Sequence, residues 1–164
     1  MSETTVDARL QFCTFTLHGL LFGLEVNQIQ EVLLYQDMTR VPLAPPMVRG
    51  LINLRGQIVT AIDLRRRLEF PPLAGEQRPM NVVVRTDDGA VSLLVDEIGD
   101  VVEVDEATFE APPETLTGLA RDVTRGVYKL DGRLLVIIDI HRILHVQHMT
   151  DSNRAAGEDA RVAA

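Results

Sequence analysis

The chain of 164 residues contains no tryptophan, a single cysteine and no long hydrophobic segment. The lone Cys13 cannot form an intrachain disulfide, and unpaired cysteine is usual in a reducing compartment. No apolar run approaches the roughly 20 residues that a membrane-spanning helix needs. Residues 1–11 lack the apolar segment of a signal peptide. We therefore expect a soluble, cytoplasmic protein without direct membrane insertion.

Positive charge is scarce, because 16 Lys and Arg residues stand against 24 Asp and Glu residues, for a net charge of −8. Binding to a phosphate backbone needs clustered basic residues, so the composition excludes nucleic acid as an expected partner. The one basic run, residues 65–67, is interpreted as the solvated face of a helical turn. Aromatic residues make up only 4% of the chain and hydrophobic residues 46%, so the core is expected to be aliphatic.

Two segments of 19 residues, 50–68 and 126–144, align without a gap. They share seven identical residues, where ordinary amino-acid frequencies would give roughly one. The identical pairs are Gly50/Gly126, Leu54/Leu130, Gly56/Gly132, Ile62/Ile138, Asp63/Asp139, Arg66/Arg142 and Leu68/Leu144. Each segment has two apolar runs around an X-Gly pair, which is typical of a β-hairpin, and then a helical turn. We therefore interpret the chain as an internal duplication.

A second repeated segment precedes each of these hairpins, since residues 22–32 align with residues 91–101. The matching apolar pairs are Val26/Val95, Ile29/Ile98 and Val32/Val101. A Pro-Pro pair follows each copy, at 45–46 and 112–113, and excludes a central strand there. Each half is thus predicted to contain a hairpin, a helical turn, a strand, a proline-rich connector and a second hairpin.

About five short strands per half, rich in Val, Ile and Leu with glycine turns, predict an all-β fold of two small closed or nearly closed barrels. Residues 134–138 are apolar at every position, so both faces of this strand need to be covered. One face can lie inside a barrel and the other needs a neighbour. We therefore expect two barrels packed through a shared aliphatic core, with the Pro- and Gly-containing residues 70–79 as the linker between the halves.

The folded domain is expected to span residues 11–146. Residues 1–10 are polar and are predicted to be disordered. Residues 147–164 are polar and Ala-rich, and are predicted to form a flexible or frayed helical tail.

Two aspartates, Asp63 and Asp139, occupy matching positions directly before the two helical turns. An Asp at such a position accepts hydrogen bonds from free backbone N–H groups, and we interpret both as helix caps. The less favoured alternative is a small β-barrel hydrolase, whose catalytic dyad would require contact between the two carboxylates. His141, His145 and His148 fall on one face of a helix, but no further ligand accompanies them. We expect neither a metal nor a cofactor.

The tips of the two aligned hairpins differ at one position, with Arg55-Gly56 in the first copy and Asp131-Gly132 in the second. Asp-Gly is a preferred pair of the type I′ turn, whereas Arg gains nothing at a position with positive φ. The cation of Arg55 must project from the tip. It either joins a surface ion pair, worth about 0–1 kcal/mol, or meets a partner, and we favour recognition of a partner.

The run PLAPPMVRGLINLRGQIVTAIDL, with the upstream FGLEVNQIQEV and the later VDEIGDV and RLLVIIDIHRIL, resembles the CheW family of chemotaxis coupling proteins. The resemblance covers about residues 11–146 and implies two small intertwined SH3-like five-stranded β-barrels with short helical turns. It also implies a non-catalytic adaptor that joins the cytoplasmic tip of a chemoreceptor (a methyl-accepting chemotaxis protein) to the regulatory domain of a CheA-type histidine kinase. In the family the receptor tip docks in the groove between the barrels. The matching positions are Ile29, Glu31, Val32, Gly50, Asn53, Arg55 and Val101.

Such an adaptor would be cytoplasmic and would associate with membrane receptor arrays through its partners. The same residues suit a coupling protein of a chemosensory-like pathway that controls pili, biofilm or gene expression. The sequence features are common to both functions.

Overall fold

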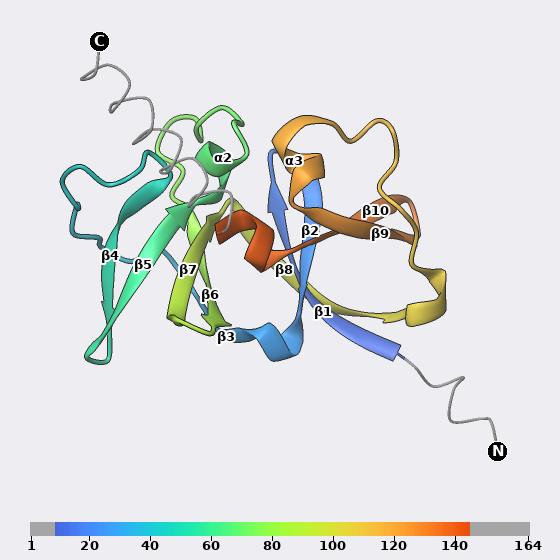
Figure 1. Ribbon diagram of the computed structural model, residues 1–164, viewed down its shortest axis with the longest axis horizontal. Coiled ribbons are helices and arrows are strands. Elements are labelled where there is room, and N and C mark those ends of the chain that lie inside the picture. Colours follow the sequence, from blue (N-terminus) through green and yellow to red (C-terminus); the bar gives the residue numbers. More distant parts are fainter. Residues whose placement is uncertain (1–8, 145–164) are drawn as a thin grey trace, which may run out of the picture.

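The computed structural model describes residues 9–144, which form ten strands and a few short helical segments (Figure 1). Strand β1 begins at Arg9 and so includes the last two residues of the segment that was expected to be disordered. The rest of that segment and the predicted tail, 147–164, lie outside the described residues. Across residues 9–144, no helix is both long enough and apolar enough to cross a membrane.

The ten strands form two five-stranded sheets, which we call barrel A and barrel B. In spatial order, barrel A contains β8 (Glu97–Asp105), β1 (Arg9–Leu17), β2 (Leu20–Glu25), β10 (Arg133–Ile138) and β9 (Thr124–Leu130). Barrel B contains β3 (Ile29–Leu33), β6 (Met80–Thr86), β7 (Gly89–Val95), β5 (Gln57–Asp63) and β4 (Val48–Leu54). Neighbouring strands are antiparallel except β2 with β10 and β5 with β7, which are parallel. The predicted all-β fold of two five-stranded units is confirmed.

The two barrels exchange strands between the duplicated halves. Barrel A combines β1 and β2 of the first half with β8–β10 of the second, and barrel B combines β3–β5 with β6 and β7. The chain crosses between barrels at the 3-10 turn η1 (Val26–Gln28) and again at Asp96. Residues 70–79, expected to link the two halves, join α2 to β6 within barrel B, so the halves of the sequence do not correspond to the two barrels.

Each barrel is closed by the segment that continues beyond its edge strand. In barrel B, Thr39 and Leu51 exchange backbone hydrogen bonds of 2.8 and 2.9 Å, and in barrel A Glu110 and Val127 do the same at the matching place. Gly50 precedes Leu51 in β4, and Gly126 precedes Val127 in β9. Because these glycines have no side chain, the two backbones can approach closely. A Cβ on Gly50 would lie 2.6 Å from the carbonyl oxygen of Thr39. The duplicated glycine is thus required by the closing contact of the barrel.

Substituting either closure glycine with alanine is expected to destabilise the fold. At Gly126 an added Cβ would collide with the ring of Phe109 and lie 2.5 Å from the Glu110 carbonyl oxygen. We expect Gly50→Ala and Gly126→Ala each to lower the free energy of unfolding by about 1–3 kcal/mol, measured by urea denaturation. Gly75→Ala is the control, because its Cβ meets no atom within 4 Å and only its φ of 62° opposes the change. Equal effects at all three positions would contradict this role.

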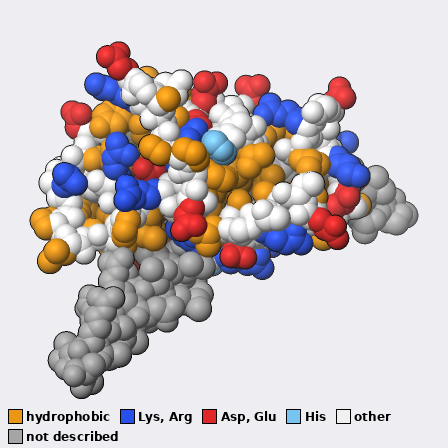
Figure 2. Space-filling view, turned by 90° about the horizontal axis from the view of Figure 1, so that it is seen from above, with side chains coloured by type: hydrophobic (Ala, Val, Ile, Leu, Met, Phe, Trp, Pro, Cys, Tyr) orange, Lys and Arg blue, Asp and Glu red, His pale blue; other side chains and the backbone are white. Residues whose placement is uncertain are grey.

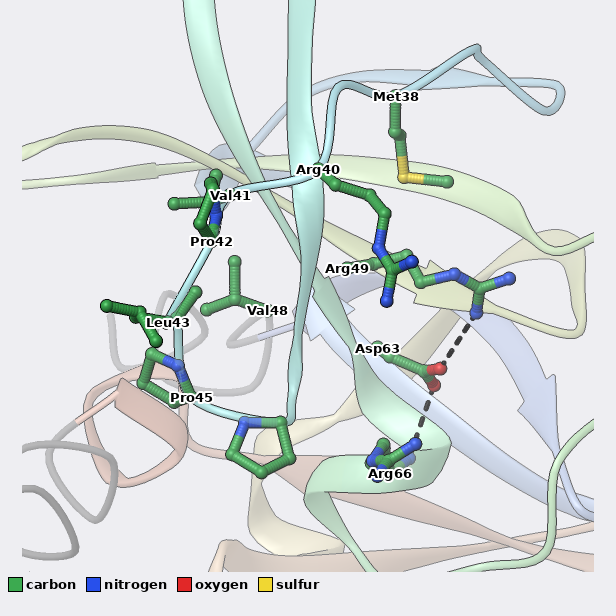
Figure 3. Close-up of a pocket in the computed structure, with 12 residues that line it drawn as sticks. Met38, Arg40, Val41, Pro42, Leu43, Pro45, Val48, Arg49, Asp63 and Arg66 are labelled. Atoms are coloured by element: carbon green, nitrogen blue, oxygen red, sulfur yellow. Dashed lines mark hydrogen bonds and ion pairs between the residues drawn. The ribbon is translucent and has the colours of Figure 1, made fainter.

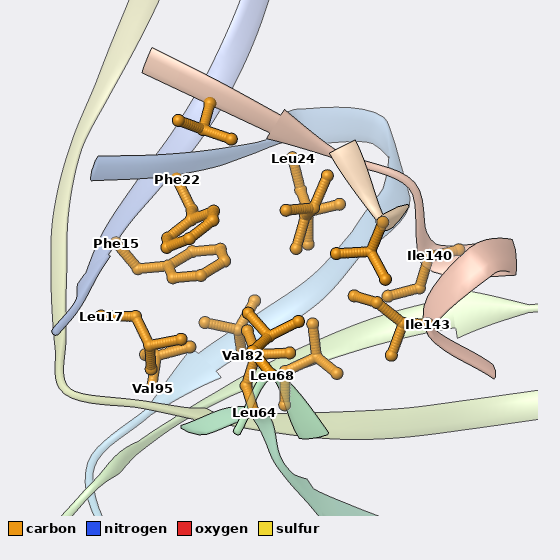
Figure 4. Close-up of a cluster of buried hydrophobic side chains, with 14 of the residues drawn as sticks. Phe15, Leu17, Phe22, Leu24, Leu64, Leu68, Val82, Val95, Ile140 and Ile143 are labelled. Carbon is orange, nitrogen blue, oxygen red and sulfur yellow. The ribbon is translucent and has the colours of Figure 1, made fainter. Parts of the chain in front are cut away.

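The largest apolar cluster lies between the barrels and contains side chains of both (Figure 4). It joins side chains of barrel A, such as Phe15 and Phe22, to side chains of barrel B, such as Val82. Two smaller clusters fill the separate interiors of barrels A and B. Strand β10 contributes to two clusters, since residues 135 and 137 point into barrel A while 136 and 138 point into the shared cluster. The predicted shared aliphatic core and the double-sided strand are confirmed.

The basic run 65–67 is not a solvated face as a whole, because only Arg66 is exposed, and that interpretation is wrong for Arg65 and Arg67. Arg67 lies in helix α2 (Leu64–Arg67) and is only 4% exposed. Its guanidinium donates hydrogen bonds to the carbonyl oxygens of Ile143, at 3.0 Å, and Arg142, at 3.3 Å. Carbonyls at the end of a helical segment have no partner within it, and a buried Arg supplies the missing donors. Burial lowers the pKa of Arg67, which still stays charged.

Arg65 forms a second tertiary contact from the same helical turn. Its Nε and Nη2 atoms each lie 2.6 Å from a carboxylate oxygen of Asp96, and both side chains are less than one-fifth exposed. The backbone N–H of His18 also donates to Asp96, at 2.9 Å. Burial alone would raise the pKa of Asp96, but these hydrogen bonds outweigh it and hold the pKa below its ordinary value. The ion pair therefore ties α2 to the second crossing between the barrels.

Candidate functional site

The tip of the β4–β5 hairpin has a backbone that is unusual for its residues. Arg55 has φ 53° and Gly56 has φ 87°, which are the positive values of a type I′ turn. At the matching tip in barrel A, Gly132 has φ 80° while Asp131 has no positive φ. Asp131-Gly132 is therefore not in a type I′ turn, although Asp-Gly is a pair that this turn prefers. The two copies make different turns, and the left-handed conformation belongs to the arginine.

The side chain of Arg55 forms an ion pair with Glu31 on β3. Its Nη2 and Nη1 atoms lie 3.0 and 3.4 Å from the two carboxylate oxygens of Glu31. The Arg55 side chain is 82% exposed, whereas that of Glu31 is 17% exposed. The carboxylate thus holds the guanidinium in one direction while leaving most of it open to solvent. The surface ion pair considered from the sequence is present, and the cation remains accessible beside it.

Polar and apolar side chains flank this ion pair on the same hairpin. The side-chain oxygen of Asn53 accepts a hydrogen bond of 3.0 Å from the N–H of Gly56, so this residue stabilises the turn. Ile58 lies opposite Asn53 in the β4–β5 register and is 61% exposed. Ile58 was not among the residues predicted from the sequence. Strand alternation could have found it, because the neighbouring Val59 is fully buried.

Strand β3 also carries the candidate residues Val32 and Ile29. Val32 is 42% exposed, and Leu34 just beyond the strand is 71% exposed. Ile29 is half-buried and packs against the shared core. Val32 and Leu34 can therefore contact a partner directly, whereas Ile29 also contributes to the stability of the fold.

Two of the candidate residues lie apart from the Arg55–Glu31 pair. Gly50 is buried at the closing contact of barrel B, so it has no surface for a partner and its role is structural. Val101 is 57% exposed but belongs to β8, the edge strand of barrel A, where it pairs with Cys13. By the duplication, Val101 is the counterpart of Val32 on the other barrel.

Asp63 and Asp139 act as helix caps, as predicted. Asp63 accepts from the backbone N–H of Arg66 at 3.2 Å, and Asp139 accepts from the N–H groups of His141 and Arg142 at 2.9 and 3.2 Å. Asp63 is the last residue of β5 in barrel B and Asp139 follows β10 in barrel A, and each carboxylate has its own arginine partner. These contacts suit helix caps, whereas a catalytic dyad needs two carboxylates that share a proton.

The remaining titratable candidates do not form a described site. His141 lies in the helical segment 140–144, while His145 and His148 lie outside the described residues. Within residues 9–144 no group of three His, Cys, Asp or Glu side chains could hold a metal ion. Cys13 is buried, and its burial raises the pKa of the thiol. A raised pKa disfavours the reactive thiolate.

Two interlocked barrels that carry an exposed, pre-oriented cation beside exposed aliphatic side chains have the features of a protein-interaction module. The CheW-like domain family model matches residues 11–148, and the chain therefore belongs to the CheW-like family. It is 34% identical to the chemotaxis protein CheW of Bacillus subtilis over 133 residues, which is 79% of this chain and 83% of that protein. It is also 27% identical to the protein PilI of Pseudomonas aeruginosa over 124 residues, covering 74% of this chain and 68% of PilI.

A solved structure has the same architecture. The scaffolding protein TtCheW from Thermoanaerobacter tengcongensis matches with a TM-score of 0.74 at 28% identity, over 82% of this chain and 91% of that chain. The predicted membership of the CheW family and the two SH3-like barrels are confirmed.

Proposed function

We propose that this chain is a non-catalytic coupling adaptor, which joins the cytoplasmic tip of a chemoreceptor to the regulatory domain of a CheA-type histidine kinase in a chemosensory array. The observation that carries this proposal is the match to the CheW-like family over nearly the whole described fold. Through these partners the protein would be held at a membrane receptor array from the cytoplasm.

The receptor-binding surface is proposed to centre on the Arg55–Glu31 pair, with Asn53, Val32 and Ile29 around it. A receptor tip is helical, and a helix docks by placing an apolar stripe on exposed aliphatic side chains while its polar side chains meet the charged ones. Val32 supplies an exposed aliphatic contact and Arg55 an exposed cation. Val101 would supply the equivalent aliphatic contact from barrel A, so that the receptor meets both barrels.

Exchanging the charges of the ion pair separates recognition from stability. Arg55→Glu and Glu31→Arg are each expected to weaken binding of a receptor-tip fragment by roughly 30-fold, about 2 kcal/mol for a central interface residue. Their melting temperatures should change by only a few degrees, because an exposed ion pair contributes about 0–1 kcal/mol. The double variant restores an ion pair in reverse and should recover stability without recovering affinity. Full recovery of receptor binding in the double variant would show that only the pair, and not the position of the cation, is needed.

A charged residue on the aliphatic part of the surface is expected to affect one partner more than the other. Val32→Asp and Val101→Asp should each weaken receptor binding by about tenfold or more and leave binding of the kinase regulatory domain nearly unchanged, in parallel titrations. Leu134→Asp, on an exposed leucine at the β9–β10 hairpin, is the control. Equal losses for receptor and kinase would place the surface elsewhere.

The similarity to PilI keeps a second function open, that of a coupling protein in a chemosensory-like pathway controlling pili, biofilm or gene expression. Both functions use the same fold and the same type of surface. Purification of the chain with its receptor from native membranes, followed by identification of the receptor and kinase, distinguishes them.

A further inference from the structure

A second surface of barrel B collects positive charge on a protein of net charge −8. Arg40 of the loop 34–47, Arg49 of β4 and Arg66 of α2 line one open cavity of about 810 Å³. Figure 3 shows the side chains of Arg40 and Arg49 extending toward each other, with Asp63 between Arg49 and Arg66. Seen from the α2 side, Figure 2 shows basic side chains, here arginines, among hydrophobic ones over barrel B, at the left.

The single carboxylate of this cavity is already engaged. Asp63 accepts from the guanidinium of Arg49 at 3.1 Å and from the backbone N–H of Arg66 at 3.2 Å. Within the described residues, the guanidinium groups of Arg40 and Arg66 have no ion-pair or hydrogen-bond partner. Gathering three guanidinium groups around one carboxylate is unfavourable by itself, and an added anionic group would relieve it.

A fully exposed leucine lies at the edge of the same cavity. Leu43 is fully exposed (101%) and has φ 64°. Residues other than glycine rarely adopt this left-handed conformation. Prolines 42, 45 and 46 surround it, so the loop is stiff and Leu43 is held outward. Val41 next to it is 37% exposed. The strain and the exposure of Leu43 serve no contact of the described fold, and such residues gather at binding sites.

We propose that this arginine–leucine cavity docks an acidic polypeptide segment of a protein partner, with carboxylates on Arg40 and Arg66 and an aliphatic side chain against Leu43. Guanidinium groups bind carboxylates bidentately, and the preformed loop loses little conformational freedom on binding. A free small anion would satisfy the arginines but would leave Leu43 exposed. The occupant with both kinds of group is therefore a peptide chain.

This surface is separate from the proposed receptor-binding surface. Arg49 and Asp63 lie at the open end of the β4–β5 hairpin and Arg55 lies at its tip, so roughly 20 Å of strand separates them. The inference does not depend on whether the Arg55–Glu31 surface binds a receptor.

The test uses the full chain and an array of short synthetic peptides, in which the number of glutamates rises stepwise and leucines are replaced by serine in a parallel series. We expect retention to rise with glutamate content and to require leucine. The double variant Arg40→Glu/Arg66→Glu should lose about tenfold or more in affinity for the retained peptides. Arg133→Glu, an exposed arginine of barrel A, should leave binding unchanged. Leu43→Gly, which relieves the strain, should weaken binding while the melting temperature holds or rises.

Four results would overturn the proposal. Peptide retention that is independent of glutamate content, or that survives the double arginine variant with an unchanged melt, excludes the acidic segment. Displacement of every retained peptide by millimolar inorganic phosphate, with no effect of Leu43→Gly, assigns the cavity to small anions. Self-association of the wild-type chain in sedimentation equilibrium, abolished by the double variant, assigns the surface to a second copy of this chain.

Discussion

Residues 1–74 and 75–164, produced as separate polypeptides, are expected to be unfolded or aggregated, with no cooperative thermal transition. The cut separates β1 from β8, β2 from β10, β3 from β6 and β5 from β7, so each sheet loses two of its four strand pairings. Each fragment would also expose its side of the shared apolar cluster. Circular dichroism melts measure the loss of the cooperative transition, and light scattering measures aggregation. A cooperative melt from either fragment alone would contradict the prediction.

Two further polypeptides separate strand exchange from the shared core. Co-expression of 1–74 with 75–164 provides every strand and is expected to restore a soluble, cooperative complex. Residues 29–95 contain all five strands of barrel B in one stretch, but leave side chains such as Val82, Val84 and Leu93 without their partners from barrel A. This fragment is therefore also expected to aggregate or to melt without cooperativity. A stable 29–95 fragment would mean that barrel B does not need the shared core.

Asp96→Ala is expected to be the most destabilising single substitution of an ionised side chain considered for this protein. It removes both hydrogen bonds to Arg65 and leaves that guanidinium, whose side chain is 14% exposed, without its partner. Breaking such a pair from one side should lower the free energy of unfolding by about 2–3 kcal/mol, and the melting temperature by roughly 5–10 °C for a chain of this size. The control is Glu103→Ala, because the side chains of the Arg9–Glu103 pair are 59% and 50% exposed. That change should cost less than about 1 kcal/mol.

The same pair gives a pH dependence of known sign. The folded-state pKa of Asp96 lies below its unfolded value, so its contribution to stability is present above the ordinary Asp pKa of about 3.9 and is lost as the pH falls through the folded pKa. Urea denaturation of wild type and Asp96→Ala should therefore differ fully at neutral pH and converge below about pH 4. A difference that persists unchanged into acid would assign the effect to packing and not to the charge.

Local periodicity and duplication were sufficient to predict the hairpins, the proline connectors and the two aspartate caps. They also predicted the shared core, since a strand that is apolar at every position, 134–138, needs cover on both sides. These features depend on residues near one another in sequence, so a short sequence pattern is enough to recognise them.

Strand exchange could not be predicted in the same way, because each half contains a plausible set of five strands for a barrel of its own. Which hairpin completes which sheet depends on contacts between residues far apart, such as the parallel pairing of β2 with β10. The burial of Arg67 has the same origin, since its carbonyl partners belong to the other half of the chain. From sequence alone, three consecutive arginines are indistinguishable from a solvated face.

Arg55 and Glu31 were candidates from the sequence, and their binding of a partner stays a prediction. The ion pair that joins them could not be predicted, because it depends on how β3 meets the β4–β5 tip in space. Gly50 was assigned to binding because it matches a family position, whereas the structure places it in the closing contact of barrel B. A residue that matches a family motif can thus serve the backbone and not the partner.

The exchange of strands between halves also sets the order in which the chain can fold during synthesis. All strands of barrel B have been made once Val95 leaves the ribosome, but β2 pairs with a strand more than 100 residues further on. At ordinary elongation rates the β1–β2 hairpin therefore waits roughly 5–20 s for β10. During that interval the apolar face formed by Phe15, Phe22 and Leu24 has only barrel B to pack against. Consequently, the β1–β2 hairpin of the nascent chain must pack against barrel B before barrel A is complete.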